Sequence, residues 1–300
     1  YAAGPSINII ATYLALLLLS AAATGLVASS PGVYASGIIA DEGAEESGLL
    51  PYEIITHIDG EAISEYSDFS YEMSDLSAGD VAVFTVLSHV DSQGERTQRD
   101  ILVILGDRYD YYIGLCDGDS DCISETEGIL DELGIEQGDA FLGVSGLRST
   151  STTVDMYSSI TSSERGLLEN TLVTGLAPLG MIGVPIAYDG QTMLLEEREM
   201  LQAGDGIVAS ALGTDGMLML FDFLFWMVWI NFLLGFANLI PMIPFDGGHI
   251  VKDGVHSVLS RLVKGANPLR IESIAGRISS MSSFVILFIV MLPIILPRLV

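Results

Sequence analysis

Long apolar stretches without charge alternate with polar segments along this chain. Residues 7–28 carry no charge and, at 1.5 Å per residue, are long enough to cross a hydrocarbon core of about 30 Å. Residues 223–240 form a second uncharged stretch, and residues 282–297 form a third that Pro293 interrupts. The pattern predicts three membrane-spanning helices. A signal peptide is the alternative for the first stretch, but that stretch lacks a basic leader and is longer than a signal-peptide core.

A fourth apolar stretch, residues 167–188, contains Glu169, Asn170, three glycines and two prolines. This composition predicts a re-entrant or surface-packed segment and not a span. Five of the twelve basic residues lie in residues 251–277, which places that segment in the cytoplasm. With three spans, the polar region after residue 30 is then extracytoplasmic. If residues 167–188 also crossed, both regions would lie on the cytoplasmic side.

Within the polar region, alternation of apolar and polar residues predicts strands at Val81–Leu87 and Ile101–Leu105, joined through a turn at Asp91–Gly94. Residues 67–76 are predicted to be a helix. We therefore divide the chain into residues 1–30, a transmembrane helix; 31–107, an α+β domain; 108–215, an acidic region with a second small module; 216–250, a transmembrane helix; 251–280, a basic cytoplasmic loop; and 281–300, a transmembrane helix.

Charge is distributed unevenly along the chain. The net charge is -27, from 39 acidic and 12 basic residues, and residues 31–165 hold 28 of the acidic residues but five of the basic ones. Binding to nucleic acid is excluded, because it requires clustered lysine and arginine. Abundant carboxylates with two lysines favour a halophilic, haloarchaeal source, where salt screens self-repulsion. An acidic protein from a mesophile is the alternative.

The only cysteines, Cys116 and Cys122, flank a segment with three aspartates. On the extracytoplasmic side, this spacing favours a small disulfide loop. A calcium loop would also contain alternating aspartates, but it requires glycine at the sixth position and glutamate at the twelfth, where this chain has Cys122 and Gly128.

Directly after the second span, two prolines precede an acidic residue. Pro241 and Pro244 each interrupt a helix, so the backbone should open there and present Asp246 from unwound chain. A carboxylate at that depth is costly unless it is paired or binds a cation. The structural alternatives for Asp246 are a helix cap and an ion pair with Lys252.

Three positions of the second span lie on one helical face at spacings of four and three. They are Asn231, Gly235 and Asn238, and they predict a polar stripe that faces other helices and not lipid. Hydrogen bonds between helices and contacts with a substrate are equally compatible with this stripe.

The run Asn-x-x-Pro-x-x-Pro-x-Asp-Gly-Gly-His over residues 238–249 resembles the second metal-binding motif of the site-2 protease family of intramembrane zinc metalloproteases. Residues 3–8 resemble the segment after that family's first catalytic helix, and residues 43–60 resemble part of a PDZ domain. The resemblance implies a membrane α-helical fold with about three spans in this chain and an inserted α+β PDZ-like extracytoplasmic domain.

The resemblance also implies an activity, which is hydrolysis of peptide bonds in or next to transmembrane segments of membrane proteins. Asp246 would bind Zn²⁺, and Asn238, Pro241, Pro244 and Gly247 would contact the substrate. The implied partners are a transmembrane protein substrate, membrane lipid and a peptide ligand of the PDZ-like domain. The implied location is the cell membrane, as a multi-pass protein.

One departure from the family is large. The family's His-Glu-x-x-His helix, which supplies two zinc ligands and the general base, is absent from this sequence. We expect that helix upstream of Tyr1; an inactive relative is the alternative. His249 is not expected to be a ligand, and His57, His89 and His256 are expected to be surface or packing residues. The competing function is a non-catalytic membrane adaptor that binds peptides through the PDZ-like domain.

Overall fold

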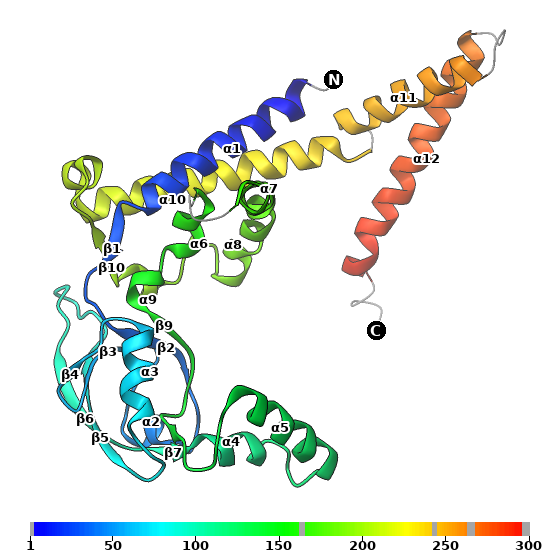
Figure 1. The fold of residues 1–300 in the computed structure, drawn as a ribbon. Helices are drawn as coiled ribbons and strands as arrows, with labels where there is room; N and C mark the ends of the chain where they lie inside the picture. The colour runs from blue at the N-terminus through cyan, green and yellow to red at the C-terminus, as the bar shows by residue number, and fades with distance from the viewer. Residues whose placement is uncertain (1–2, 162–165, 242–244, 263–267, 296–300) are drawn as a thin grey trace. The chain divides into compact units, whose positions relative to one another are not determined.

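The computed structural model describes residues 3–161, 166–241, 245–262 and 268–295 (Figure 1). They form two compact units. The sheet unit comprises Ala23–Ser159 and Met193–Leu218, and the helical unit comprises the described residues of Tyr1–Ala22, Ile160–Thr192 and Met219–Val300.

The sheet unit is built on an antiparallel sheet with the strand order β6-β5-β3-β2-β9. Its strands are β2 (Val33–Ile38), β3 (Ile54–Ile58), β4 (Glu61–Ala62, paired with β3), β5 (Val81–Leu87), β6 (Gln98–Ile104) and β9 (Val144–Ser149). The short helix α2 (Gly43–Glu46) and helix α3 (Tyr66–Ser74) lie between strands in the sequence. The apolar side chains of the sheet and of α3 form one core, in which Val33, Phe84 and Val103 are fully buried.

The predicted elements of this region are largely confirmed. Strand β5 has the predicted bounds, β6 begins three residues early and α3 is shifted by one or two residues. Asp91 accepts hydrogen bonds from the backbone N–H groups of Gln93 and Glu95, as its place in the turn requires. Strand β2 pairs along its length with β9, more than a hundred residues later, so the sheet continues beyond residue 107, where the sequence analysis places the end of the α+β domain. An inserted α+β domain therefore fits, and its PDZ identity stays a prediction.

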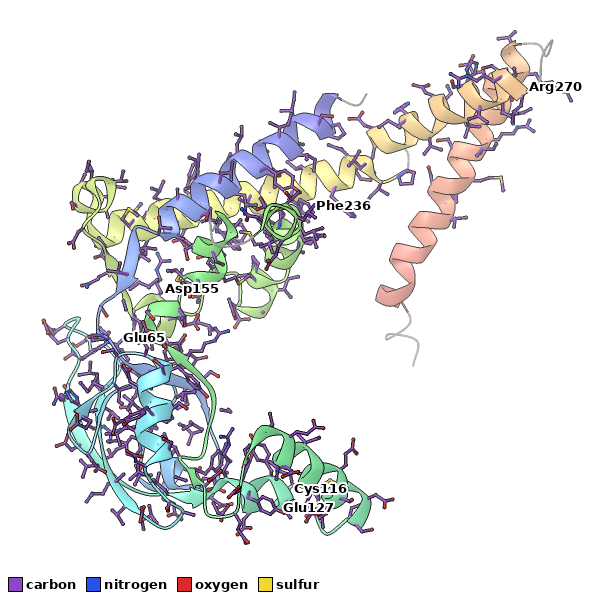
Figure 2. All side chains as sticks on the ribbon, viewed as in Figure 1. Glu65, Cys116, Glu127, Asp155, Phe236 and Arg270 are labelled. Atoms are coloured by element: carbon purple, nitrogen blue, oxygen red, sulfur yellow. A yellow bond between two sulfur atoms is a disulfide. The ribbon has the colours of Figure 1, made fainter. Side chains whose placement is uncertain are left out.

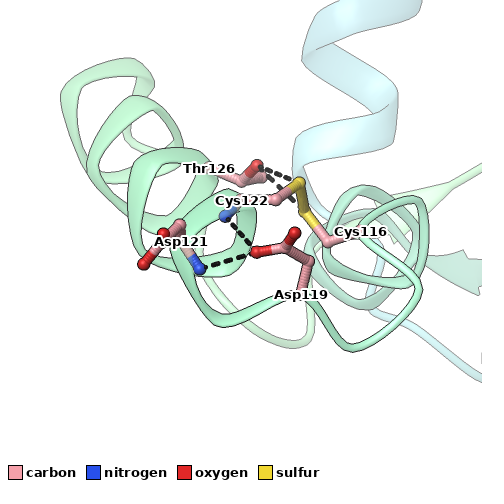
Figure 3. Close-up of a disulfide and its surroundings, with 5 residues drawn as sticks. All are labelled: Cys116, Asp119, Asp121, Cys122 and Thr126. Carbon is pink, nitrogen blue, oxygen red and sulfur yellow. Dashed lines mark hydrogen bonds between the residues drawn. A yellow bond between two sulfur atoms is a disulfide. The ribbon is translucent and has the colours of Figure 1, made fainter.

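Residues 106–141 leave the sheet and return to it. They form β7 (Gly106–Asp107), α4 (Arg108–Gly114), α5 (Ser120–Leu133) and β8 (Ala140–Phe141), and β7 pairs with β8. Cys116 and Cys122 form the predicted disulfide (Figure 3), and Cys116 is labelled in this region in Figure 2. Asp119 accepts hydrogen bonds from the N–H groups of Asp121 and Cys122, so it caps α5.

The Gly- and Ser-rich sequence of residues 149–163 suggests a linker or a second small module, but residues 144–161 are packed and do not form a linker. They contain β9, η1 (Thr150–Thr152), α6 (Asp155–Ser158) and η2 (Ser159–Thr161). Thr150 and Tyr157 are buried, and the Thr150 hydroxyl donates to the carbonyl of Ser30. Residues 144–159 are therefore part of the sheet unit, which ends at Ser159 in this part of the chain.

The segment that leads into the last long helices is anchored to the sheet. It forms α9 (Leu195–Arg198) and β10 (Leu201–Ala203), and β10 pairs with β1 (Leu26–Ala28). The hydroxyl of the fully buried Tyr34 donates to Glu197 at 2.9 Å, and Arg148 lies 3.7 Å from the same carboxylate. Burial, followed by the charge of Glu197, raises the pKa of Tyr34.

The helical unit contains α1 (Ala3–Ala23), α7 (Leu167–Ile182), α8 (Val184–Ala187), α11 (Asp246–Leu262), α12 (Pro268–Ile295) and most of α10 (Ile207–Leu239). The first predicted span is shifted, because α1 begins and ends earlier than residues 7–28 and residues 26–28 form strand β1. Helix α10 contains the second predicted span and is interrupted at Gly213, where φ is 66°.

Three described segments are long and apolar enough to cross a membrane, namely Gly4–Ala23, Leu168–Ala187 and Ile207–Leu239. Residues 168–187, which the sequence analysis predicts to be re-entrant or surface-packed, are thus long and apolar enough to be a candidate span, and their place in or on the membrane stays a prediction. Within the unit, the Tyr13 hydroxyl donates to the carbonyl of Gly175 and the Trp229 indole donates to that of Ile182, so α7 contacts both α1 and α10.

Most of the segment predicted as a basic cytoplasmic loop is helical, since residues 251–262 belong to α11 and residues 268–277 to α12. Helices α11 and α12 pack antiparallel: the Ser279 hydroxyl donates to the carbonyl of Gly248, and Lys252 lies 3.3 Å from Glu272. The third predicted span, residues 282–297, lies in the second half of α12 as far as Ile295, and its remainder lies outside the described residues. Its insertion in the membrane stays a prediction.

Candidate functional site

The predicted break after the second span is present. Helix α10 ends at Leu239, residues 240, 241 and 245 are not helical, and α11 begins at Asp246. Pro241 is half-buried in this break, while Pro244 lies outside the described residues. Asp246 is therefore the first residue of a helix and is not presented from unwound chain, which corrects the prediction. A carboxylate in the first turn of a helix also interacts favourably with the helix dipole.

Gly247 fixes this junction. A Cβ atom at this position would collide with the carbonyl oxygens of Leu239 and Ile240, so α11 starts in close contact with the end of α10. The N–H of Gly248 donates to the carbonyl of Phe245 at 3.1 Å. The glycine after Asp246 is therefore required by this close approach of two backbone segments.

The Asp246 carboxylate lies beside the first turn of α1. A Cβ atom built on Gly4 would lie 3.2 Å from Oδ2 of Asp246. Lys252 pairs with Glu272, so the ion pair between Asp246 and Lys252 that the sequence left open is not formed. In the described part of the chain, Asp246 has no ion pair.

Close packing of α1 on α10 supports this placement. Gly235 is buried, and a Cβ atom there would lie 2.9 Å from Cδ1 of Ile9 and 3.3 Å from Cβ of Asn8. Small residues allow helix backbones to approach in this way within a membrane. The predicted stripe therefore faces α1 at Gly235.

The two asparagines of the stripe differ. The Asn231 amide donates to the carbonyl of Met227 in its own helix, at 2.8 Å. The side chain of Asn238 is half-buried and makes no hydrogen bond to any residue that the structure describes. The donor and acceptor groups of the Asn238 side chain thus remain available for a hydrogen bond two residues before the break.

The histidines lie where the sequence predicted packing or surface positions. Nδ1 of His57 lies 3.1 Å from the Thr56 hydroxyl, and Nε2 of His89 lies 2.7 Å from the carbonyl of Pro51. Both belong to the sheet unit. His249 follows Asp246 by about one turn on α11, and its exclusion as a ligand stays a prediction.

The residues present do not by themselves make a zinc site. Within the described ranges, no three His, Cys, Asp or Glu side chains are grouped so that they could bind one metal ion. A protein zinc site needs at least three ligands, and Asp246 supplies one carboxylate. No catalytic step can therefore be assigned to a metal held by these residues alone.

Sequence reasoning missed a second carboxylate near the candidate spans. Asp222 of α10 accepts a hydrogen bond from the buried Thr192 hydroxyl at 2.6 Å. The available signal was an acidic residue directly before an uncharged stretch. Its hydrogen bond with Thr192 explains how this carboxylate is accommodated.

The sheet unit holds a separate groove of about 420 Å³ between α3 and β9. Phe69 and Met73 of α3 and Leu147 of β9 contribute apolar surface, and Arg108 contributes a cation. Among the described strands, β9 ends the sheet and pairs with β2 alone. An extended peptide could add to such an edge.

The sequence matches the family model of Peptidase family M50 over residues 1–286. A comparison with curated proteins finds no significant match. The family match covers α1, the sheet unit, the break at Pro241 and Asp246 in one alignment, so these parts belong to one family pattern.

Proposed function

This chain belongs to peptidase family M50, the site-2 protease family, and we propose that it takes part in zinc-dependent hydrolysis of peptide bonds in or next to transmembrane segments of membrane proteins. Family membership establishes an intramembrane metalloprotease at the level of the family and, with the three apolar helices, a membrane location. The observation that carries the proposal is the Asp246 carboxylate at the junction of α10 and α11, beside the first turn of α1.

Asp246 is the proposed zinc ligand of this chain. The other ligands and the general base would come from residues that this sequence does not contain, since it has no His-Glu-x-x-His segment. When bound, zinc would activate a water molecule for attack on the peptide carbonyl. Gly247 would hold Asp246 in place through its contact with Leu239 and Ile240.

The substrate would be a membrane helix that has locally unwound, because the carbonyls of an intact helix are already hydrogen-bonded. Asn238 would bind the freed backbone of the substrate, and Pro241, Pro244 and Gly247 would contact the substrate beside it. We also propose that the protein is multi-pass, that it contacts lipid directly and that its acidic region is extracytoplasmic. The family match does not favour the non-catalytic adaptor.

The test replaces Asp246 in the complete protein. Asp246→Asn keeps size and one acceptor oxygen but removes the anion, so cleavage of a membrane-embedded substrate should fall at least about a hundredfold, and Asp246→Ala should be as severe. Asp253→Asn, which removes a charge from an exposed position on the same helix, is the matched control and should retain cleavage. Wild-type cleavage by Asp246→Ala, at equal expression, would refute the ligand assignment.

A second proposed function is recognition of a peptide by the sheet unit, supported by the groove beside the free edge of β9. The peptide would add to β9 as a strand and place apolar side chains against Phe69 and Met73. Arg108 would attract a carboxylate of the peptide. A heptapeptide of alternating valine and threonine with a free carboxyl end should bind more tightly than its amidated form, and Arg108→Gln should remove that difference. Equal binding of both forms by the wild type would contradict this role of Arg108.

A further inference from the structure

The hairpin of α11 and α12 carries a second cavity, of about 570 Å³. Gly248, His249 and Lys252 line it from α11. From α12, the lining residues lie at spacings of three to four residues, from Ser273 to Phe284, so they occupy one face of that helix. Gly276 lies on this face, and a Cβ atom there would meet nothing within 4 Å. The cavity is therefore open above Gly276.

The cavity is cationic in a strongly acidic chain. Lys252 and Arg277 line it, and no acidic side chain does, although the chain has 39 acidic and 12 basic residues. Lys252 lies 3.3 Å from Glu272, whereas Arg277 is exposed and forms no ion pair with a described residue. The hydroxyls of Ser273 and Ser280 add hydrogen-bond donors. Two cationic side chains together with two hydroxyl donors can bind a phosphate group.

The cavity also has an apolar end. Met281 and Phe284 line it, and their side chains are 68% and 73% exposed. Residues 273 and 284 are about 16 Å apart along the helix at 1.5 Å per residue. A soluble phosphate would use the cationic end and leave this apolar surface uncovered. A lipid would cover both, with its headgroup at Arg277 and its acyl chains along Phe284.

We propose that the cavity between α11 and α12 binds the phosphate headgroup of an anionic membrane lipid, with Arg277 and Lys252 as the cations that pair with the phosphate. The missing side chain at Gly276 leaves the space that the headgroup occupies. This inference concerns a site distinct from the Asp246 carboxylate and does not depend on proteolysis. Glu272 competes with the lipid phosphate for Lys252.

The test titrates the purified 300-residue chain, in neutral detergent, with dioleoylphosphatidylglycerol or dioleoylphosphatidylcholine and counts bound lipid by native mass spectrometry. The wild type should prefer phosphatidylglycerol about tenfold. Arg277→Gln should weaken its binding about fivefold, and Glu272→Gln should strengthen it by freeing Lys252. Gly276→Leu fills the cavity without changing charge and should abolish the preference, whereas Gly254→Leu on an equally open site of α11 should not.

Equal binding of the two lipids by the wild type would overturn the proposal. So would an undiminished preference in a folded Gly276→Leu chain, since the charges would then attract lipid without the cavity. A competition experiment with inorganic phosphate distinguishes the two sources of a phosphate group. If inorganic phosphate displaces phosphatidylglycerol at equal concentration, the site binds free phosphate and the lipid assignment is wrong. The gain expected for Glu272→Gln keeps the test decisive even if Gly276→Leu does not fold.

Discussion

The sheet unit and the helical unit bury their apolar side chains in different ways. In the sheet unit, Val33, Phe84 and Val103 are fully buried in one core. In α1, by contrast, Ile7 and Leu14 are 65% and 58% exposed, while small residues such as Gly235 bring helix backbones together. A core excluded from water stabilises the first unit, whereas the exposed apolar side chains of the second are typical of helices that lie in a membrane.

The two units should therefore differ in their sensitivity to mutation. Close backbone contacts should matter most in the helical unit, whereas ion pairs and charge should matter most in the sheet unit. The two tryptophans, Trp226 and Trp229, both lie in α10, so their fluorescence reports on the helical unit. Backbone hydrogen exchange reports on both units separately.

The largest effect is expected from Gly247→Ala. The added methyl group would collide with the carbonyl oxygens of Leu239 and Ile240, so the junction that places Asp246 must open. We expect a loss of about 3 kcal/mol in the helical unit, seen as a lower midpoint of SDS unfolding by tryptophan fluorescence. Cleavage should fall at least about a hundredfold, because small displacements of a catalytic group are costly.

Gly254→Ala is the matched control. It makes the same change on the same helix where a Cβ atom meets nothing within 4 Å, so alanine should stabilise α11 by up to about 1 kcal/mol. If both variants unfold at the wild-type midpoint, the close contact at Gly247 does not stabilise the junction. Hydrogen exchange of the sheet unit should be unchanged in both.

Elements that depend on neighbouring residues in the sequence can be predicted from it, whereas elements that depend on pairing with a distant segment cannot. Strand β5 was predicted to the residue because its alternation is local. Strand β9, Val-Ser-Gly-Leu-Arg-Ser, has little alternation, and its partner β2 is distant in sequence. Residues 26–28 are as apolar as the helix before them, and only pairing with β10 makes them a strand.

The candidate site was predicted in part for the same reason. The prolines predict the break after Leu239, since their effect on a helix is local. The contacts of Gly247 with Leu239 and of Gly4 with Asp246 depend on how separate helices pack, and no periodicity encodes them. Zinc ligation by Asp246 stays a prediction because the described residues supply one ligand.

The next largest effect is expected in the sheet unit, from Glu53→Ala. Glu53 is 3% exposed and accepts hydrogen bonds from Arg99 at 2.7 Å and from the N–H of Leu50 at 3.0 Å. Its removal should destabilise the unit by about 2–3 kcal/mol, less than a fully buried pair because Arg99 is 37% exposed. Backbone hydrogen exchange should become faster across β3, β5 and β6, while the tryptophan fluorescence stays unchanged. Glu61→Ala, at an exposed position of β4, should change neither signal.

A smaller effect is expected from salt. Because residues 31–165 carry a net charge of -23, screening should relieve repulsion in the sheet unit. Between 0.1 M and 2 M KCl, its melting temperature should rise by about 3–5 °C, which corresponds to about 1 kcal/mol. The helical unit, with far less charge, should change little in the same detergent. If KCl changed the stability of the two units equally, both the expected difference between the units and the halophile prediction would be contradicted.

The smallest effect is expected from Glu42, which precedes α2. A Cβ atom on Gly106 would lie 2.6 Å from its Oε2, so the carboxylate lies against the backbone. Burial, and then the charges of Glu46 and Asp41, raise the pKa of Glu42 above its usual value. The folded state therefore binds this proton more tightly than the unfolded state, so ionised Glu42 destabilises the fold above its folded pKa. That cost is relieved as the pH falls through the folded pKa toward the ordinary glutamate value.

Glu42→Gln should accordingly raise the melting temperature of the sheet unit at pH 7.5 and make less difference at pH 5, because glutamine mimics the protonated acid at both. The control is Glu61→Gln, which removes the same charge at an exposed position. The difference in melting temperature between this variant and the wild type should vary less with pH. A benefit of Glu42→Gln that is as large at pH 5 as at pH 7.5 would mean that ionisation of Glu42 is not its cause. The same variant should leave the tryptophan signal of α10 unchanged, since Glu42 and the groups that raise its pKa belong to the sheet unit.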